Sequence, residues 1–314
     1  MMKNRIPSVL LCCLLFILVC TGCSQSKADT DAYFTFTDDT GTVISLPEKP
    51  ENTAVLFSSF ADIWGLAGGK IAVTVGETVE RGFASPDVVL VDNGAGKTVN
   101  AELLIAAKPD FVICSADIAA QSETASLLNA SGIPAAQFRV ESFADYLRVL
   151  KIFTDITGDK EAYIRYGTDV QAQIDALLAA YPPDGASPKR ILFIRAGSTA
   201  KSTKAKTAAE HFAAAMLGEL GAVNIADAAP VLIDGLSIEE ILMQDPDMIF
   251  ITTMGDSAAA QAYLESVFAE DIWQSLDAVR NRNYHYLPKD LFQYKPNASW
   301  YSAYELLAAL LYEN

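Results

Sequence analysis

The sequence predicts an α/β protein with two Rossmann-like lobes, each built on a mostly parallel sheet, joined by a single long α-helix. Three observations support this prediction. Short apolar runs alternate with helical patterns before residue 143 and again after residue 188, as in consecutive βα units. A long amphipathic pattern over 160–181 lies between the two series and stops at Pro182. Each series also contains the same motif of one glutamate and one Pro-Asp pair, which indicates an internal repeat.

The chain begins with the features of a secretory signal peptide. Lys3 and Arg5 precede an apolar run over 9–19, and small residues follow it. The run is shorter than the roughly 20 residues that a membrane-spanning helix needs, so a cleaved signal is a better interpretation than a transmembrane anchor. The residues before Cys23 resemble a bacterial lipobox, with Cys20 in place of the usual leucine. We therefore expect lipidation at Cys23, with ordinary signal cleavage nearby as the alternative.

The sequence divides into five expected segments. They are a lipoprotein signal peptide at 1–23, a polar tether at 24–32, an N-terminal lobe at 33–157, an interlobe helix at 158–182 and a C-terminal lobe at 183–314. Of the five cysteines, only Cys114 lies in the folded body, inside an apolar run. We expect it to be a buried thiol, and no disulfide can form within one mature chain.

The elements of the N-terminal lobe follow from local patterns. Phenylalanines alternate with threonines before the turn at 38–41 and an extended segment follows, which predicts a small hairpin over 34–46. Apolar runs predict strands at 54–57, 71–75, 87–91, 111–114 and 135–138. Helical spacing predicts helices at 61–67, 101–107, 121–129 and 143–156.

Local patterns also predict the elements of the middle segment and of the C-terminal lobe. The pattern at 160–181 predicts a helix of about 30 Å, which is long enough to connect two lobes as a rod; a long packing helix within one domain is the alternative. Apolar runs predict strands at 191–194, 248–252 and 284–287, with a basic polar loop at 195–206. Helical spacing predicts helices at 208–220, 238–243, 258–268, 272–279 and 299–312.

The internal repeat places one glutamate at the start of a helix in each lobe. Asn100 precedes Glu102, and Ser237 precedes Glu239. Asparagine and serine suit the position that caps a helix, and the helix dipole favours a carboxylate in the first turn. These reasons alone could make both glutamates structural.

Several segments together resemble a known family, the class III substrate-binding proteins of ABC importers, which take up iron siderophores, haem and cobalamin. The segments are both glutamate motifs, Thr37-Asp38-Asp39-Thr40-Gly41 with 43–47, and the stretches 156–162, 220–224 and 276–280. The resemblance implies two rigid lobes joined by one long helix, with the ligand in the cleft between them. It also implies that Glu102 and Glu239 dock on arginines of the permease, with Glu240 only a neighbour.

Charge and motif content exclude several other functions. The net charge is −16, and loss of the signal makes it more negative, so nonspecific binding to nucleic acid is disfavoured. The segment 94–98 looks like a phosphate-binding loop, but Val91 stands where that loop needs glycine. His211 and His285 each lack a second ligand at helical spacing, so we expect no protein metal site. No serine elbow or Cys-His arrangement is present, and we expect no enzyme.

In open parallel sheets, ligands bind beyond the carboxyl ends of the strands. That rule selects the loops at 58–60, 77–81, 115–117, 195–206, 253–256 and 290–300. The residues in these loops that we expect to contact ligand are Ser58, Phe60, Arg81, Arg195, Lys204, Met254, Phe292, Tyr294 and Trp300.

Each candidate type has its own chemistry. Arg195 and Arg81 would favour an anionic ligand, such as a ferric catecholate or carboxylate chelate or the propionates of haem. The lysines at 201–206 could join them or form a solvated loop. Phe292, Tyr294 and Trp300 would offer flat apolar contact, and Met254 or Tyr294 could ligate haem iron.

The sequence therefore predicts an extracytoplasmic, lipid-anchored binding protein, monomeric and without a cofactor of its own. Its ligand would be an iron chelate delivered to a membrane ABC permease, and haem or cobalamin is the next choice. A lipoprotein enzyme or chelatase on the same scaffold is the alternative from another class, and it would need a titratable pair in the cleft.

Overall fold

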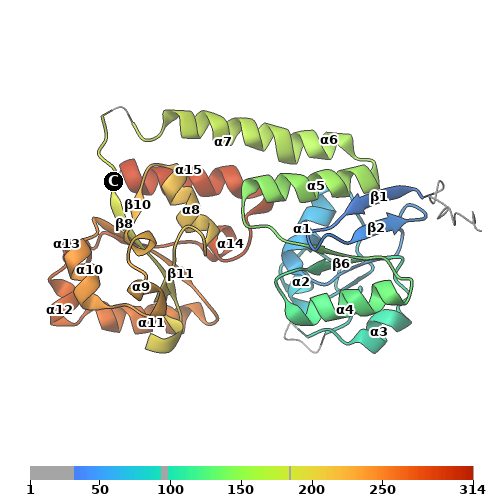
Figure 1. The fold of residues 1–314 in the computed structure, drawn as a ribbon, viewed down its shortest axis with the longest axis horizontal. Coiled ribbons are helices and arrows are strands. Elements are labelled where there is room, and N and C mark those ends of the chain that lie inside the picture. The colour runs from blue at the N-terminus through green and yellow to red at the C-terminus, as the bar shows by residue number, and fades with distance from the viewer. Residues whose placement is uncertain (1–31, 93–97, 184, 314) are drawn as a thin grey trace, which may run out of the picture.

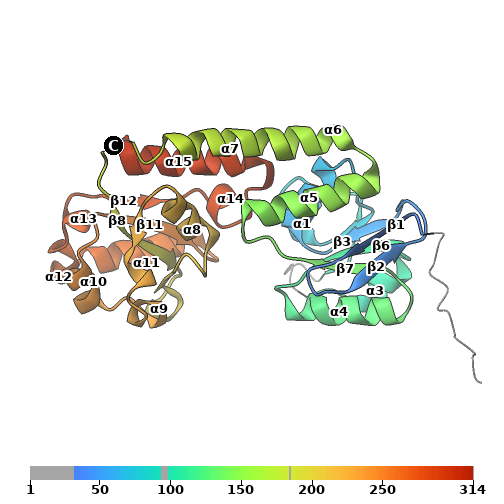
Figure 2. The same ribbon diagram turned by 45° about the horizontal axis from the view of Figure 1, so that its top comes forward.

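The computed structural model describes residues 32–92, 98–183 and 185–313. Two α/β lobes lie side by side, and a layer of helices runs along one side of both (Figures 1 and 2). Cys23 and most of the tether lie outside the described residues, as does most of the phosphate-loop-like segment. The fold class predicted from the sequence is confirmed.

The N-terminal lobe contains a parallel sheet covered by helices on both faces. From edge to edge its strands are β5 (Val89–Leu90), β4 (Val73–Thr74), β3 (Thr53–Val55), β6 (Phe111–Ser115) and β7 (Ala135–Phe138). Every residue of the central strand β6 is buried, as expected when both faces of a parallel sheet are covered. The helices of this lobe are α1 (Ser58–Leu66), α2 (Gly76–Glu80), α3 (Ala101–Ala106), α4 (Ala119–Ala130) and α5 (Phe143–Thr157).

The C-terminal lobe repeats this plan with one difference. Strands β10 (Val223–Asn224), β8 (Arg190–Ala196), β11 (Met248–Thr253) and β12 (Tyr284–Tyr286) form a parallel sheet in that order. The loop expected at 195–206 also contains β9 (Lys204–Ala205), which pairs antiparallel with β8. The helix expected at 272–279 is two short helices. The helices of this lobe are α8 (Phe212–Glu219), α9 (Val231–Asp234), α10 (Ile238–Gln244), α11 (Ser257–Phe268), α12 (Asp271–Gln274), α13 (Asp277–Arg280), α14 (Lys289–Phe292) and α15 (Trp300–Tyr312).

One long helical segment spans both lobes, as predicted (Figure 1). It runs from α6 (Lys160–Tyr163) through one π-helical turn (Ile164–Thr168) into α7 (Asp169–Ala180). Asp159 caps its start by accepting from the Ala162 amide at 3.0 Å. The segment ends just before Pro182, whose ring cannot continue a helix. The π-helical turn has no counterpart in the sequence pattern.

The helical layer also carries a hydrophobic core that belongs to both lobes. Trp300, at the start of α15, is 1 % exposed. Its ring packs edge-on against Phe143 of α5 at 6.1 Å and against Phe212 of α8 at 5.4 Å between centroids. Because α5 belongs to the N-terminal lobe and α8 to the C-terminal lobe, this contact joins the two lobes.

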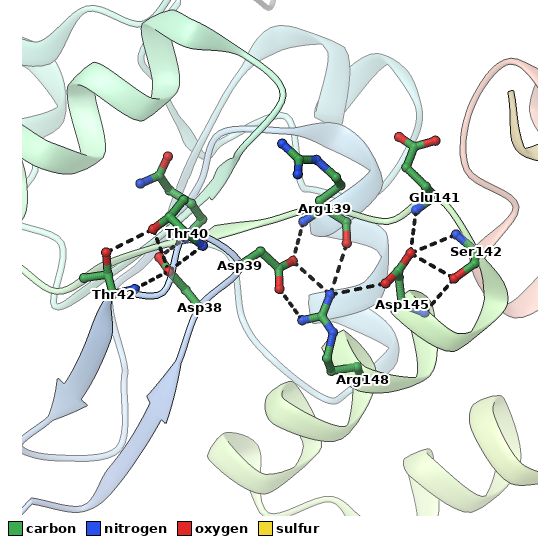
Figure 3. Close-up of polar contacts among 10 residues, drawn as sticks. Asp38, Asp39, Thr40, Thr42, Arg139, Glu141, Ser142, Asp145 and Arg148 are labelled. Atoms are coloured by element: carbon green, nitrogen blue, oxygen red, sulfur yellow. Dashed lines mark hydrogen bonds and ion pairs between the residues drawn. The ribbon is translucent and has the colours of Figure 1, made fainter. Parts of the chain in front are cut away.

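A polar network fixes the N-terminal hairpin, β1 (Phe34–Thr37) and β2 (Val43–Leu46), onto the sheet. Figure 3 shows that the Asp38 carboxylate accepts hydrogen bonds across the hairpin turn, while Asp39 faces Arg139 and Arg148. The Asp39–Arg148 ion pair measures 2.6 Å. Because Arg139 and Glu141 follow β7, this network positions a loop at the carboxyl end of the sheet, beside the other lobe.

Candidate ligand site between the lobes

A cavity of about 770 Å³ lies between the lobes, within the size range of small-molecule pockets. Helices α1 and α2 line it on the N-terminal side. The segment from α14 to the 3₁₀ turn η4 (Asn297–Ser299) lines it on the other side. Its charged and aromatic lining residues are Asp62, Glu77, Glu80, Arg81, Phe83, Lys289, Asp290, Tyr294 and Lys295. We call this the interlobe cavity.

Arg81 connects the two walls of the interlobe cavity. Its Nη1 donates hydrogen bonds to the hydroxyls of Ser58 at 2.8 Å and Ser59 at 3.3 Å, both at the start of α1. The guanidinium also lies 3.9 Å from the ring centroid of Tyr294 in the other lobe, a cation–π contact. Burial lowers the pKa of Arg81, while the negative charge of Glu77 opposes that shift. An arginine so placed stays charged.

A second group of cations lies in the C-terminal lobe and consists of Arg195, Lys204, Lys206 and Lys295, which we call the basic cluster. Arg195 of β8 stands opposite Lys204 of β9, so their side chains share one face of the sheet. Lys206 forms an ion pair with Glu210 at 3.2 Å. Lys295 forms another with Glu141 of the N-terminal lobe at 2.9 Å. Lys295 thereby belongs to both the basic cluster and the interlobe cavity.

Three cations of the basic cluster, Arg195, Lys206 and Lys295, act on one partly buried residue, His211. The imidazole packs against Phe193 and Phe212 at 4.7 and 5.0 Å between centroids, and its Nδ1 accepts from the Ala213 amide at 3.2 Å. Burial is the main cause that lowers the pKa of His211 to about 3, and the positive charges of Lys295, Arg195 and Lys206 contribute to the same shift. His211 is therefore neutral, and the positive charge here comes from lysine and arginine.

The structure brings some of the predicted contact residues together. Arg81 and Tyr294 line the interlobe cavity, and Ser58, although buried, supports Arg81. Arg195 and Lys204 lie in the basic cluster, outside the lining of the cavity. Met254 follows β11 and is 39 % exposed, and it is not part of that lining either.

Three predicted aromatic contacts need correction. Phe60, Phe292 and Trp300 are buried in the core that both lobes share. In this structure their rings face other apolar side chains and present no surface to a ligand. The loops that carry them do lie between the lobes, but large aromatic rings at the start of helices pack inward because burial stabilises them.

The sequence reasoning did not select Lys289, Lys295 and Asp62, which also line the interlobe cavity. The two lysines carried a signal, because they are the only Lys or Arg residues after Arg282 in a strongly acidic chain. Asp62 carried none, since its helix reads as an ordinary amphipathic segment.

Glu102 and Glu239 occupy corresponding first turns of α3 and α10. Asn100 caps α3 by accepting from the amides of Glu102 and Leu103 at 3.0 and 3.1 Å. Ser237 instead donates its hydroxyl to the Glu239 carboxylate at 3.3 Å, so the predicted serine cap is not formed. Both glutamates are exposed, and α3 and α10 lie toward opposite ends of the molecule (Figures 1 and 2).

The described part of the chain shows neither a metal site nor a membrane-spanning helix. Among residues 32–92, 98–183 and 185–313, no three His, Cys, Asp or Glu side chains gather as a metal site. Within the same ranges, no helix combines the length and apolar character needed to cross a membrane. Cys114 is buried, as predicted, and burial raises the pKa of its thiol to about 12, so it is not a nucleophile at neutral pH.

Solved structures share this two-lobed architecture at low sequence identity. Staphylococcus aureus SirA in complex with staphyloferrin B is 18 % identical with a TM-score of 0.65, and the match covers 88 % of this chain and 97 % of that one. The haem-binding protein RhuT from Roseiflexus sp. RS-1 is 17 % identical with a TM-score of 0.66, covering 84 % and 98 %. The vitamin B12-binding protein BtuF of Vibrio cholerae is 20 % identical with a TM-score of 0.67, covering 84 % and 98 %.

The comparison by sequence agrees with the architecture. No curated protein matches the chain. The protein-family model for periplasmic binding proteins matches residues 54–291, which include both sheets, the long helix and both glutamate motifs. As the resemblance in its sequence implied, the chain belongs to the periplasmic binding protein family.

Proposed function

We propose that this protein captures a ferric siderophore between its lobes and delivers it, as a monomer, to the permease of an ABC importer. Proteins of this family bind a small molecule outside the cytoplasm and work with such a permease. The lipobox-like sequence at Cys23 supports anchoring of the protein to the membrane through a lipid. Binding rather than catalysis is the role we infer.

The observation that carries the choice of ligand is the basic cluster beside the interlobe cavity. Arg195, Lys206 and Lys295 all act on His211, and Arg81 adds a further cation across the cavity, although the chain has a net charge of −16. Hydrogen bonds between such cations and an anionic ligand each contribute about 1.5 to 3 kcal/mol. Ferric catecholates and carboxylates are anionic chelates of suitable size, and similar folds hold staphyloferrin B or a ferric acinetobactin complex.

Haem and cobalamin are the competing ligands, since RhuT and BtuF share the fold. An enzyme or chelatase would need a free acid or base in the cavity. In the cavity, burial raises the pKa of Asp62. The Asp62 carboxylate, however, accepts a hydrogen bond from Asn297 at 2.8 Å. That bond gives Asp62 a structural role.

The ligand is tested by titrating the protein with ferric catecholate, carboxylate and hydroxamate siderophores, haem and cobalamin, followed by tryptophan fluorescence. We expect an anionic ferric chelate to bind, with affinity that falls as salt rises. Arg195→Ala should weaken it by about tenfold or more, the loss of one charge-assisted contact.

Arg190→Ala is the matched control, because Arg190 begins the same strand and is exposed. An unchanged affinity in Arg195→Ala, within a factor of two, would refute the anionic ligand. Binding of cobalamin or haem alone would replace the siderophore as the ligand while leaving the importer role in place.

We also propose that Glu102 and Glu239 dock on arginines of the permease. Each is exposed on its own lobe, which leaves both carboxylates accessible to a partner. The double variant Glu102→Gln, Glu239→Gln should lose two charge-assisted contacts of about 1.5 to 3 kcal/mol each and abolish whole-cell uptake. Its affinity for soluble ligand should not change.

The control for docking is the pair Glu123→Gln, Glu240→Gln, which removes the same charge from α4 and α10. Normal uptake in the Glu102, Glu239 double variant would show that these glutamates only stabilise their helices. Loss of ligand binding would place them in the ligand site instead.

A further inference from the structure

Asn297 forms a buried bridge between the lobes. It lies in η4 of the C-terminal lobe and is fully buried. Its Nδ2 donates to the Ser59 carbonyl at 3.0 Å and to the Asp62 carboxylate at 2.8 Å. Both acceptors belong to α1 of the N-terminal lobe, more than 230 residues away in the chain.

The site selects asparagine for two separate reasons. The backbone of Asn297 has φ of 50°, a left-handed conformation that asparagine and glycine tolerate best. The bridge also needs one nitrogen with two N–H groups, because a carbonyl and a carboxylate can only accept. Glycine meets the first need and aspartate has the right shape, but neither supplies the two donors.

Asn297 holds the wall of the interlobe cavity that comes from the C-terminal lobe. The segment before it carries Tyr294, whose ring lies on Arg81, and Lys295, which pairs with Glu141. The Glu141 side chain is half exposed, so solvent screens its ion pair with Lys295 and weakens that contact. The Asn297 amide is fully buried, so water replaces its hydrogen bonds less easily than the Lys295–Glu141 ion pair.

The charges around the bridge make it sensitive to loss of the amide. Asp62 faces Arg81 as well as Asn297, and Arg81 in turn faces Glu77 and Asp290. Burial is the main cause of the raised pKa of Tyr146 in α5, and the negative charge of Asp62 raises that pKa further. Burial raises the pKa of Asp62, while the Asn297 hydrogen bond opposes that shift. Without the Asn297 amide, the partly buried Asp62 carboxylate would have no side-chain hydrogen-bond donor from the C-terminal lobe among the described residues.

We propose that Asn297 is a positioning residue that fixes the spacing of the two lobes, and with it the width of the interlobe cavity, before any ligand arrives. The lobe spacing is a property of the ligand-free protein. Only its consequence for capture rests on the proposed function.

The test measures the distance between the lobes in the full chain without ligand. Spin labels are attached through a genetically encoded ketone amino acid at the exposed positions Glu123 of α4 and Ala262 of α11, which avoids the cysteines. Asn297→Gly keeps the backbone conformation but removes both donors, so the distance distribution should broaden and shift. Asn129→Ala is the matched control, because Asn129 makes two hydrogen bonds to Ala135 within one lobe.

Asn297→Asp supplies a readout that simple destabilisation would not give. At neutral pH the new carboxylate faces Asp62, and repulsion should widen the lobe spacing further. Repulsion between two neighbouring carboxylates raises the pKa of one member of the pair. Below that raised pKa they share a proton and attract, so the original distance should return as the pH falls toward about 5. Asn297→Gly should show no such recovery.

An unchanged distance distribution in Asn297→Gly would overturn the proposal, as would an equal change in Asn129→Ala. An Asn297→Asp distance that does not depend on pH would also overturn it. None of these outcomes involves ligand, so failure of the proposed function would leave the result intact, and failure here would leave ligand identity untouched.

Discussion

At the scale of single residues, the packing of Trp64 determines which residue can follow α1. Its side chain is 2 % exposed, packs edge-on against Phe153 at 5.2 Å between centroids and donates its indole N–H to the Lys70 carbonyl at 2.9 Å. A Cβ added at Gly69 would lie only 2.1 Å from the Trp64 ring. The backbone at Gly69 therefore lies against the ring, and only glycine allows that approach.

We predict that Gly69→Ala lowers the free energy of unfolding by about 1 to 3 kcal/mol or more, because the tryptophan must leave its packed position. Urea denaturation measures the change. The control is Gly65→Ala, where the added Cβ meets nothing within 4 Å on an exposed helical position. That change should stabilise by about 0.4 to 1 kcal/mol. Equal effects of the two substitutions would contradict the prediction.

At the scale of secondary-structure elements, the Asp38 carboxylate connects the turn of the N-terminal hairpin to the sheet. Asp38 is 5 % exposed. Its Oδ1 accepts from the amides of Thr40 and Thr42 at 2.9 and 3.0 Å, and its Oδ2 accepts from the Gln137 amide of β7 at 2.9 Å. Figure 3 shows the contacts of Asp38 with Thr40 and Thr42 beside the Asp39 network. Asp38 thus closes the turn and fixes the hairpin to an edge strand at the same time.

We predict that Asp38→Asn destabilises the fold by about 1 to 3 kcal/mol, since an amide NH₂ must then face a backbone N–H and leave it without an acceptor. Hydrogen exchange of the Gln137 amide should accelerate together with that of the hairpin. The control is Asp87→Asn at an exposed position, which should change neither the stability of the fold nor the exchange rate of the Gln137 amide. If exchange at Gln137 stays slow, the carboxylate does not hold the hairpin.

At the scale of the whole molecule, the two lobes are not independent bodies on a hinge. The core formed with α5, α8 and α15 continues from one lobe into the other, and the long helix lies across both. The Trp300 contacts and the Asn297 bridge add to this connection. Ligand should accordingly close the lobes only slightly, because bending would disrupt a packed core as well as a continuous helix.

We predict a single cooperative unfolding transition for the whole chain in calorimetry, with matching calorimetric and van't Hoff enthalpies. Trp300→Ala should lower stability by about 3 to 5 kcal/mol and separate the transition into two, because it removes the ring shared by both lobes. Trp273→Ala is the control, since Trp273 packs within the C-terminal lobe alone. Two transitions in the unmodified protein would show that the shared core does not couple the lobes.

Local periodicity in the sequence predicts several parts of this fold directly. The βα alternation, the long helix at 160–181, the buried Cys114 and the repeated glutamate motif all follow from spacing within a few residues. The strand β9 was missed because two residues carry no periodic signal. The sequence pattern contains no signal for the π-helical turn. In the structure Gly167 of this turn lies against Leu147 of α5, where an added Cβ would lie 3.1 Å from that side chain.

Which loop residues line the interlobe cavity depends on how the two lobes pack together. The sequence selects the loops at the carboxyl ends of the strands as a region, yet in the structure Phe292 and Trp300 turn into the core while Lys295 and Tyr294 face the other lobe. A loop has no fixed side-chain period, so its sequence does not state which residue points inward. The bridge from Asn297 to Asp62 joins residues 235 positions apart, and such a contact exists only once both lobes have folded against each other.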